Sequence, residues 1–129
     1  MGILTMFQNW QEVEEFDPEA VIFTEGDPAD ELYVILAGEV ALTLHGESLG
    51  SERKGSIIGE MAMLESATRN ATATARGKVK LAKIDRRQLQ KLIRESPEFS
   101  LRAMTVLANR LRAVDQYISV QLDRQKPAQ

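Results

Sequence analysis

At 129 residues, 43% of them apolar, the chain is long enough for one domain with its own core. The formal net charge of −3 argues against a nucleic-acid-binding protein, because such proteins usually carry a basic surplus. No cysteine is present, which excludes disulfides and thiol chemistry, and no apolar run is long enough to span a bilayer. The first ten residues lack the pattern of a signal peptide, so we expect a cytoplasmic protein without a membrane anchor.

The pattern of apolar residues in the N-terminal half changes near residue 18. Apolar residues recur at helical spacing over 5–16 and Asp17-Pro18 follows, which predicts a short amphipathic helix within 1–17. Over 18–84, short runs rich in Val, Ile and Thr are separated by glycines, which is typical of an antiparallel β-roll of jelly-roll type. Gly77, for example, separates ATATA (71–75) from KVKLAKI (78–84), so we expect two strands there.

Two helix starts follow Ile84. Asp85 with Gln88 three residues later resembles a capping box. Ser96-Pro97-Glu98 offers an N-cap, a proline at the first helical position and an acid in the first turn, and this helix can run to about Asp123. We therefore predict an α+β fold in one domain, 1–125: a short N-terminal helix, an antiparallel β-roll and two C-terminal helices over 85–125, with a flexible tail over 126–129.

Residues 59–75, GEMAMLESATRNATATA, place the carboxylate of Glu60 and the guanidinium of Arg69 among small and apolar residues. Gly59 permits a tight turn, and a short helix after it would aim free N–H groups at an anion. Arg69 can hold the same anion with a planar, permanently charged fork, while Glu60 can accept from hydroxyls. One phosphate and one sugar hydroxyl would satisfy both side chains. The alternative is a structural role, in which Arg69 pairs with Glu60 or Glu65.

The pattern G-E-M-A-M-L-x4-R-x-A-T, which begins at Gly59, resembles the phosphate-binding cassette (59–72) of cyclic-nucleotide-binding domains. Residues 21–40 resemble the opening strands of that family, and 96–115 resemble the start of its long C-terminal helix. The resemblance implies that Glu60 accepts from the ribose 2′-hydroxyl and that Arg69 binds the cyclic phosphate. It further implies backbone contacts from Gly59, Met61, Ala62 and Ala71.

The same resemblance places the base beside the last helix. Val114 and Asp115 fall where related proteins contact it, and Asp115 could accept from adenine or guanine. Asn70 stands where the family often has Ala, Ser or Thr, and it could donate to the phosphate or to a guanine edge. We expect cAMP to be favoured over cGMP. The alternative is a module of the same fold that serves interactions and binds no nucleotide.

The last helix carries an apolar series at alternating three- and four-residue spacing, namely Met104, Leu107, Leu111, Val114 and Ile118. The series is either one face of the core or a coiled-coil seam. The resemblance favours a parallel homodimer and a signal passed to an effector protein. We expect no DNA binding, since no recognition helix can follow residue 125. One histidine, His45, and no nucleophile motif leave no basis for catalysis or a metal site.

Overall fold

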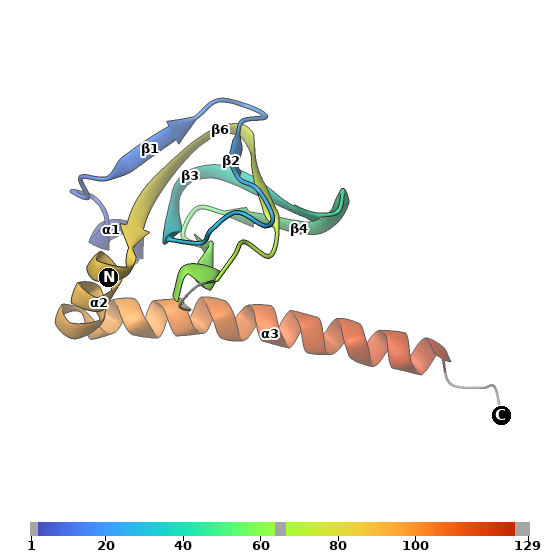
Figure 1. Cartoon of the computed structure of the whole chain (residues 1–129). Helices are drawn as coiled ribbons and strands as arrows, with labels where there is room; N and C mark the ends of the chain where they lie inside the picture. The colour runs from blue at the N-terminus through green and yellow to red at the C-terminus, as the bar shows by residue number, and fades with distance from the viewer. Residues whose placement is uncertain (1–2, 64–66, 126–129) are drawn as a thin grey trace.

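The computed structural model describes residues 3–63 and 67–125, which form an antiparallel β-roll lying over two C-terminal helices (Figure 1). Six strands of the described residues form one sheet in the order β1-β6-β3-β4, with β2 paired to β6 and β5 paired to β3. The predicted α+β fold class is therefore confirmed. In chain order, the elements are α1 (Ile3–Met6), β1 (Val13–Phe16), β2 (Val21–Phe23), β3 (Glu31–Leu44), β4 (Glu47–Arg53), β5 (Ile57–Ile58), the 3-10 helix η1 (Glu60–Met63), β6 (Thr72–Asp85), α2 (Arg86–Glu95) and α3 (Pro97–Gln125).

Strand β3 separates two apolar cores. Leu32 and Val34 pack with residues of the helices, including Leu89 and Phe99, while Tyr33 and Ile35 face the inside of the roll. Side chains alternate between the two faces of a strand, so a continuous apolar run fills both cores at once. This packing fixes β3 against the helices on one side and against the interior of the roll on the other.

The long pairing of β3 with β6 corrects one prediction. We expected two strands on either side of Gly77, but β6 runs unbroken through it with φ of +84°. The register with β3 shifts at this point, between the Ala37–Lys80 and Glu39–Arg76 pairs, so the glycine sits in a bulge. Since both flanks still pair with β3, the glycine bends the strand instead of ending it.

The N-terminal segment also differs from the prediction of a helix over 5–16. Only Ile3–Met6 is helical, and Val13–Phe16 is a strand paired with β6, with Val13 opposite Ala82. Backbone pairing with the edge of β6 outweighs the helical spacing of the apolar residues, because local sequence preference is only a weak determinant of secondary structure. Phe7 nevertheless anchors the segment: it is 2% exposed and its ring lies edge-on, 5.8 Å from that of Phe99.

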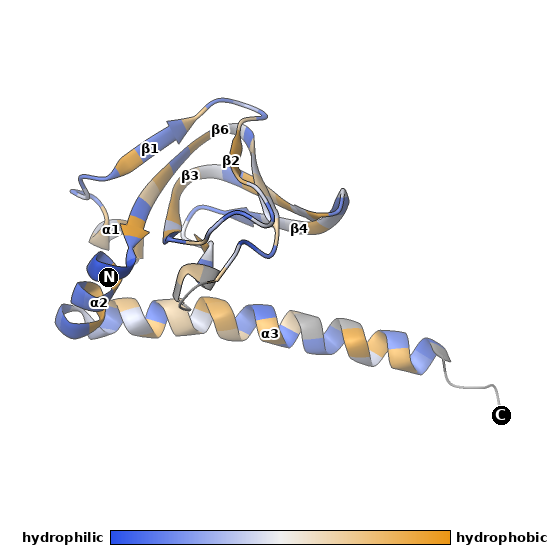
Figure 2. Ribbon diagram, viewed as in Figure 1, coloured by the Kyte–Doolittle hydropathy of each residue, from blue (hydrophilic) through white to orange (hydrophobic). Residues whose placement is uncertain are grey.

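Both predicted starts of the C-terminal helices are confirmed. Asp85 Oδ1 accepts from Gln88 N at 2.8 Å and Gln88 Oε1 accepts from Asp85 N at 2.9 Å, which is a complete capping box. Helix α3 passes beneath the roll and continues well beyond it, with apolar residues along its outer half (Figures 1 and 2). None of the helices in the described ranges has the length and apolar character needed to cross a membrane. The expected tail, 126–129, lies outside these ranges.

Candidate ligand-binding site

Gly59 connects the buried strand β5 to η1, and its conformation creates the space for Arg69. Its φ is +75°, a region that favours glycine. A Cβ at this position would lie 2.6 Å from Arg69 Nη1 and 3.2 Å from the Glu31 carbonyl oxygen. The glycine of the predicted cassette therefore allows a guanidinium to approach the backbone of the turn.

Arg69 is the one buried charged residue among the described residues, at 5% exposure. Its Nη1 donates to the Gly59 carbonyl at 3.1 Å and its Nη2 to the Glu31 carbonyl at 2.6 Å. The guanidinium carbon lies 4.3 Å from the centre of the Phe23 ring and 5.8 Å from that of Tyr33. Of the two expected alternatives, an ion pair of Arg69 with Glu60 is not what the structure has, because Glu60 pairs elsewhere, as described below. The other, a pair with Glu65, falls on a residue outside the described ranges.

The charge of Arg69 is not neutralised within the described part of the chain. No carboxylate there lies within ion-pair distance of it, and its Nε is buried without an acceptor. Burial of an ion that lacks a counter-charge is costly, so such groups are normally paired. Burial also raises the pKa of the neighbouring Tyr33, with Glu31 adding to the rise, so that this phenol stays neutral beside the guanidinium. The arrangement leaves Arg69 with an uncompensated charge and one unused donor, which a bound anion would satisfy.

Glu60 begins η1 and is held by a residue that the sequence did not single out. Its Oε2 lies 3.0 Å from Nη1 of Arg110, on α3. Arg110 also contacts Glu52 Oε1 at 3.0 Å and Ser56 Oγ at 3.1 Å, and it donates to the Ile57 carbonyl. One side chain of α3 therefore joins β4, β5 and η1.

A second arginine holds η1 from α2. Arg86 Nη2 donates to the Ala62 carbonyl at 3.0 Å, and Ala62 itself is buried. Both C-terminal helices thus contact the segment that carries Glu60. The sequence offered no signal for either arginine, since in a helix of mixed composition a cation that faces the roll resembles one that faces solvent.

The structure brings several of the predicted residues together. Gly59 and Arg69 are in contact, Ala62 and Ala71 are buried, and Asn70 is exposed beside Arg69. Residues 64–66 of the cassette and the side chains of Met61 and Val114 lie outside the part that the structure describes. Asp115 is exposed on α3, and among the described contacts none joins it to the cassette. The base-contact predictions at Val114 and Asp115 therefore remain predictions.

Comparisons with known proteins identify the family of this chain. The family model for the cyclic nucleotide-binding domain matches residues 13–96, which is more than half of the chain. The crystal structure of the catabolite activator protein of Thermus thermophilus is similar at a TM-score of 0.75, with 28% identity, over 91% of this chain and 57% of that chain.

Curated relatives point the same way. A regulatory subunit of cAMP-dependent protein kinase from Hypocrea atroviridis is 37% identical over 82 residues, which is 64% of this chain and 18% of that protein. A cGMP-dependent protein kinase of Caenorhabditis briggsae is 38% identical over 69 residues, which is 54% of this chain and 9% of that protein. The chain spans less than a fifth of the length of these two relatives. On the match of the family model, the chain belongs to the cyclic nucleotide-binding domain family.

Proposed function

We propose that this chain binds a 3′,5′-cyclic nucleotide through its cassette, 59–72, and acts as a non-catalytic regulatory module. The observation that carries the proposal is the buried guanidinium of Arg69, which has no carboxylate within ion-pair distance among the described residues and has a spare donor at Nε. A cyclic phosphate carries one negative charge, and its unprotonated oxygens can accept hydrogen bonds from the guanidinium of an arginine. Arg69 binds this phosphate, with the backbone of Gly59, Met61, Ala62 and Ala71 around it.

Glu60 supplies the second contact in this proposal, to the ribose. A carboxylate can accept several hydrogen bonds, so Glu60 can keep its pairing with Arg110 and still accept from the 2′-hydroxyl. Arg110 holds the carboxylate in place before the ligand arrives. Arg110 belongs to α3, so a ribose bound at Glu60 changes the interaction between Glu60 and Arg110. In this proposal, ligand binding is transmitted to α3 through that ion pair.

Base selectivity follows from residues at the edge of the site. We propose cAMP as the preferred ligand and cGMP as the second choice; the two curated relatives described above carry the names of one cAMP-dependent and one cGMP-dependent kinase. Asn70 is exposed next to Arg69 in the chain, and Asp115 is exposed on α3. In this proposal both contact the base of the bound nucleotide. Asp115 can accept from adenine or from guanine, so it does not discriminate between them. Asn70 can donate to a guanine edge, so a substitution at Asn70 would shift the preference between cAMP and cGMP.

Helix α3 is also the proposed dimer interface. Met104, Leu111 and Ile118 are 64%, 66% and 48% exposed, at heptad spacing. Leu107 is half-buried between α2 and α3, so it contributes partly to the core. A parallel homodimer through this face would cover the exposed residues, and an effector protein would respond to the state of α3.

Calorimetric titration of the chain with cAMP, cGMP and a cyclic dinucleotide tests the proposal. We expect saturable binding of cAMP, weaker binding of cGMP and weaker binding of both by Arg110→Met, in which Glu60 loses its partner. Absence of binding by all three nucleotides would overturn the proposal in favour of an interaction module that binds no nucleotide. Unchanged affinity in Arg110→Met would contradict the role given to α3.

A further inference from the structure

The backbone around Arg69 is tied to the turn that follows β2. Arg69 N donates to the Asp27 carbonyl at 2.7 Å, and Gly26 N donates to the Arg69 carbonyl at 2.9 Å. Glu25 N donates to Thr72 Oγ1, at the end of the cassette, at 3.0 Å. These bonds fix the point from which the Arg69 side chain starts. They do not fix its guanidinium, because a long arginine side chain keeps several rotatable bonds.

Phe23, the last residue of β2, lies with its ring against that guanidinium. The guanidinium carbon is 4.3 Å from the ring centre, well within the roughly 6 Å over which the face of an aromatic ring attracts a cation. The ring of Tyr33 stacks with that of Phe23 at 18° and lies 5.8 Å from the same carbon. The backbone of Phe23 pairs with Ala73 of β6, so the ring is held by the sheet.

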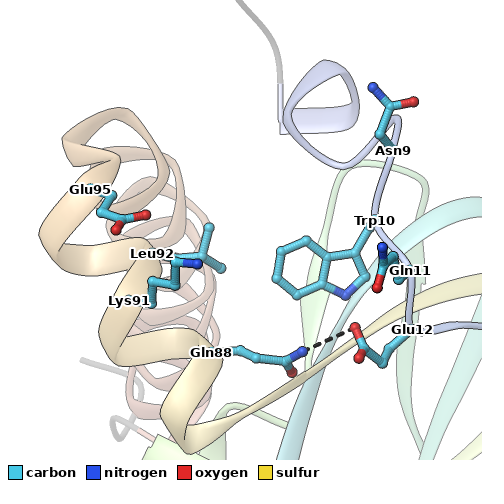
Figure 3. Close-up of a pocket in the computed structure, with 8 residues that line it drawn as sticks. All are labelled: Asn9, Trp10, Gln11, Glu12, Gln88, Lys91, Leu92 and Glu95. Carbon is cyan, nitrogen blue, oxygen red and sulfur yellow. Dashed lines mark hydrogen bonds between the residues drawn. The ribbon is translucent and has the colours of Figure 1, made fainter.

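Trp10 shows, by contrast, an aromatic ring that only packs. It lies edge-on to Phe7 at 4.9 Å, and its Nε1 donates to the Lys83 carbonyl at 2.9 Å. It faces α2 across a pocket of about 460 Å³ (Figure 3), in which Gln88 Nε2 donates to Glu12 Oε2 at 3.0 Å. The polar groups there already have partners.

The ring of Phe23 takes the place of a counter-charge for Arg69. Burial of a cation without a partner is costly, and no carboxylate of the described residues lies within ion-pair distance of this one. The negative face of an aromatic ring attracts a cation more strongly when water is excluded, so it offsets part of that cost. A ligand that finds the guanidinium in place binds more tightly, since the apparent affinity falls with the fraction of molecules that are ready to bind.

We propose that Phe23 is a positioning residue for Arg69. Its ring keeps the guanidinium buried beside Gly59 until a cyclic phosphate binds, and it thereby raises the affinity for the nucleotide. Phe23 itself touches no ligand in this scheme. The inference rests on the proposed function, because it names a residue outside the cassette, 59–72, that prepares the same site.

Calorimetric titration with cAMP tests the effect on affinity. Phe23→Leu keeps an apolar side chain and removes the ring, and we expect its affinity to be about fivefold or more below that of the native chain, or about 1 kcal/mol. Phe23→Tyr keeps a ring and should bind within about twofold of the native chain. Phe16→Leu is the matched control, since Phe16 is likewise half-buried against the same core, and it should also keep the native affinity.

A second measurement needs no ligand. Proton NMR detects the Arg69 Nε–H of the free chain, which is identified by its absence in Arg69→Ala. A ring beside the guanidinium shifts this resonance, so we expect the signal to move in Phe23→Leu and to keep its position in Phe16→Leu. If thermal denaturation shows that Phe23→Leu does not fold, Phe23→Met replaces it in both measurements.

The outcomes separate this inference from the proposed function. Binding of cAMP by the native chain with unchanged affinity in Phe23→Leu would overturn the inference alone. An equal loss in Phe16→Leu would do the same, because the effect would then come from core packing, as would an equal loss in Phe23→Tyr or an Nε–H signal that does not move. A native chain that binds no cyclic nucleotide would overturn the proposed function, and this inference with it.

Discussion

We predict that replacement of Arg69 by alanine lowers the affinity for cAMP strongly and the stability of the ligand-free protein only slightly. In the structure the guanidinium is 5% exposed, has no carboxylate within ion-pair distance among the described residues and donates to two backbone carbonyls. Its removal takes away two hydrogen bonds, each with a net contribution of about 1 kcal/mol. It also removes an unpaired buried charge, which offsets part of that loss. We therefore expect the ligand-free protein to stay folded, with a loss of less than about 3 kcal/mol.

The effect on binding is larger, because the phosphate would then be buried without its cation. Loss of one side of such a pair costs about 2–5 kcal/mol, which corresponds to an affinity about 30-fold to about 4,000-fold lower. Cyclic AMP at about 100 times the native dissociation constant stabilises the native chain by about 2.7 kcal/mol. For a domain of this size that is a rise in Tm of roughly 8–14 °C. For Arg69→Ala at the same concentration, the rise should fall to about 4 °C or less.

Thermal denaturation with and without cAMP measures these shifts, and calorimetry measures the affinities. Arg53→Ala is the matched control, since Arg53 is 80% exposed on β4 and pairs with Glu39 at 3.5 Å. This control should keep the full shift. A folded Arg69→Ala protein whose affinity for cAMP is within about threefold of the native value would refute the role of the buried guanidinium.

Three further predictions address the ribose contact, the turn and the dimer. If Glu60 accepts from the ribose, 2′-deoxy-cAMP should bind about 1–3 kcal/mol more weakly than cAMP. Glu60→Gln should reduce this difference in binding free energy. Equal affinities of the native chain for cAMP and 2′-deoxy-cAMP in calorimetry would count against the contact. Gly59→Ala should lose stability and cAMP affinity, since a left-handed φ costs about 1–2 kcal/mol and the Cβ meets a guanidinium nitrogen at 2.6 Å. Gly26 has a similar φ of +89°, but no atom lies within 4 Å of a Cβ built there, so Gly26→Ala should lose stability and keep its affinity for cAMP. An equal loss of cAMP affinity in both variants would contradict the effect ascribed to the contact between the Gly59 Cβ and Arg69. Leu111→Lys with Ile118→Lys should give a folded monomer in sedimentation, whereas a native chain that is monomeric at high micromolar concentration with cAMP would leave no role for the seam.

The sequence alone determined the features that depend on local chemistry. The capping box at Asp85 and the start of α3 at Pro97 follow from hydrogen bonds within a few residues, and the structure has both. Short runs rich in Val, Ile and Thr predicted strands over 18–84, and β3 lies within that range. The sequence singled out Gly59 and Arg69 because their residue types and spacing suit anion binding, and the structure places them in contact; their role in binding stays a prediction.

Only the tertiary structure decided the features that depend on partners distant in the chain. Residues 13–16 became a strand because β6 offered an unpaired edge, which no local signal reveals. Glu60 pairs with Arg110, fifty residues later, instead of with the nearby Arg69. Which cation faces a carboxylate depends on how α3 crosses the roll, and helical periodicity gives the face of a helix but not its rotation against a neighbour. Local bonding is therefore readable from the chain, whereas the contacts between α3 and the cassette exist only once the roll has closed.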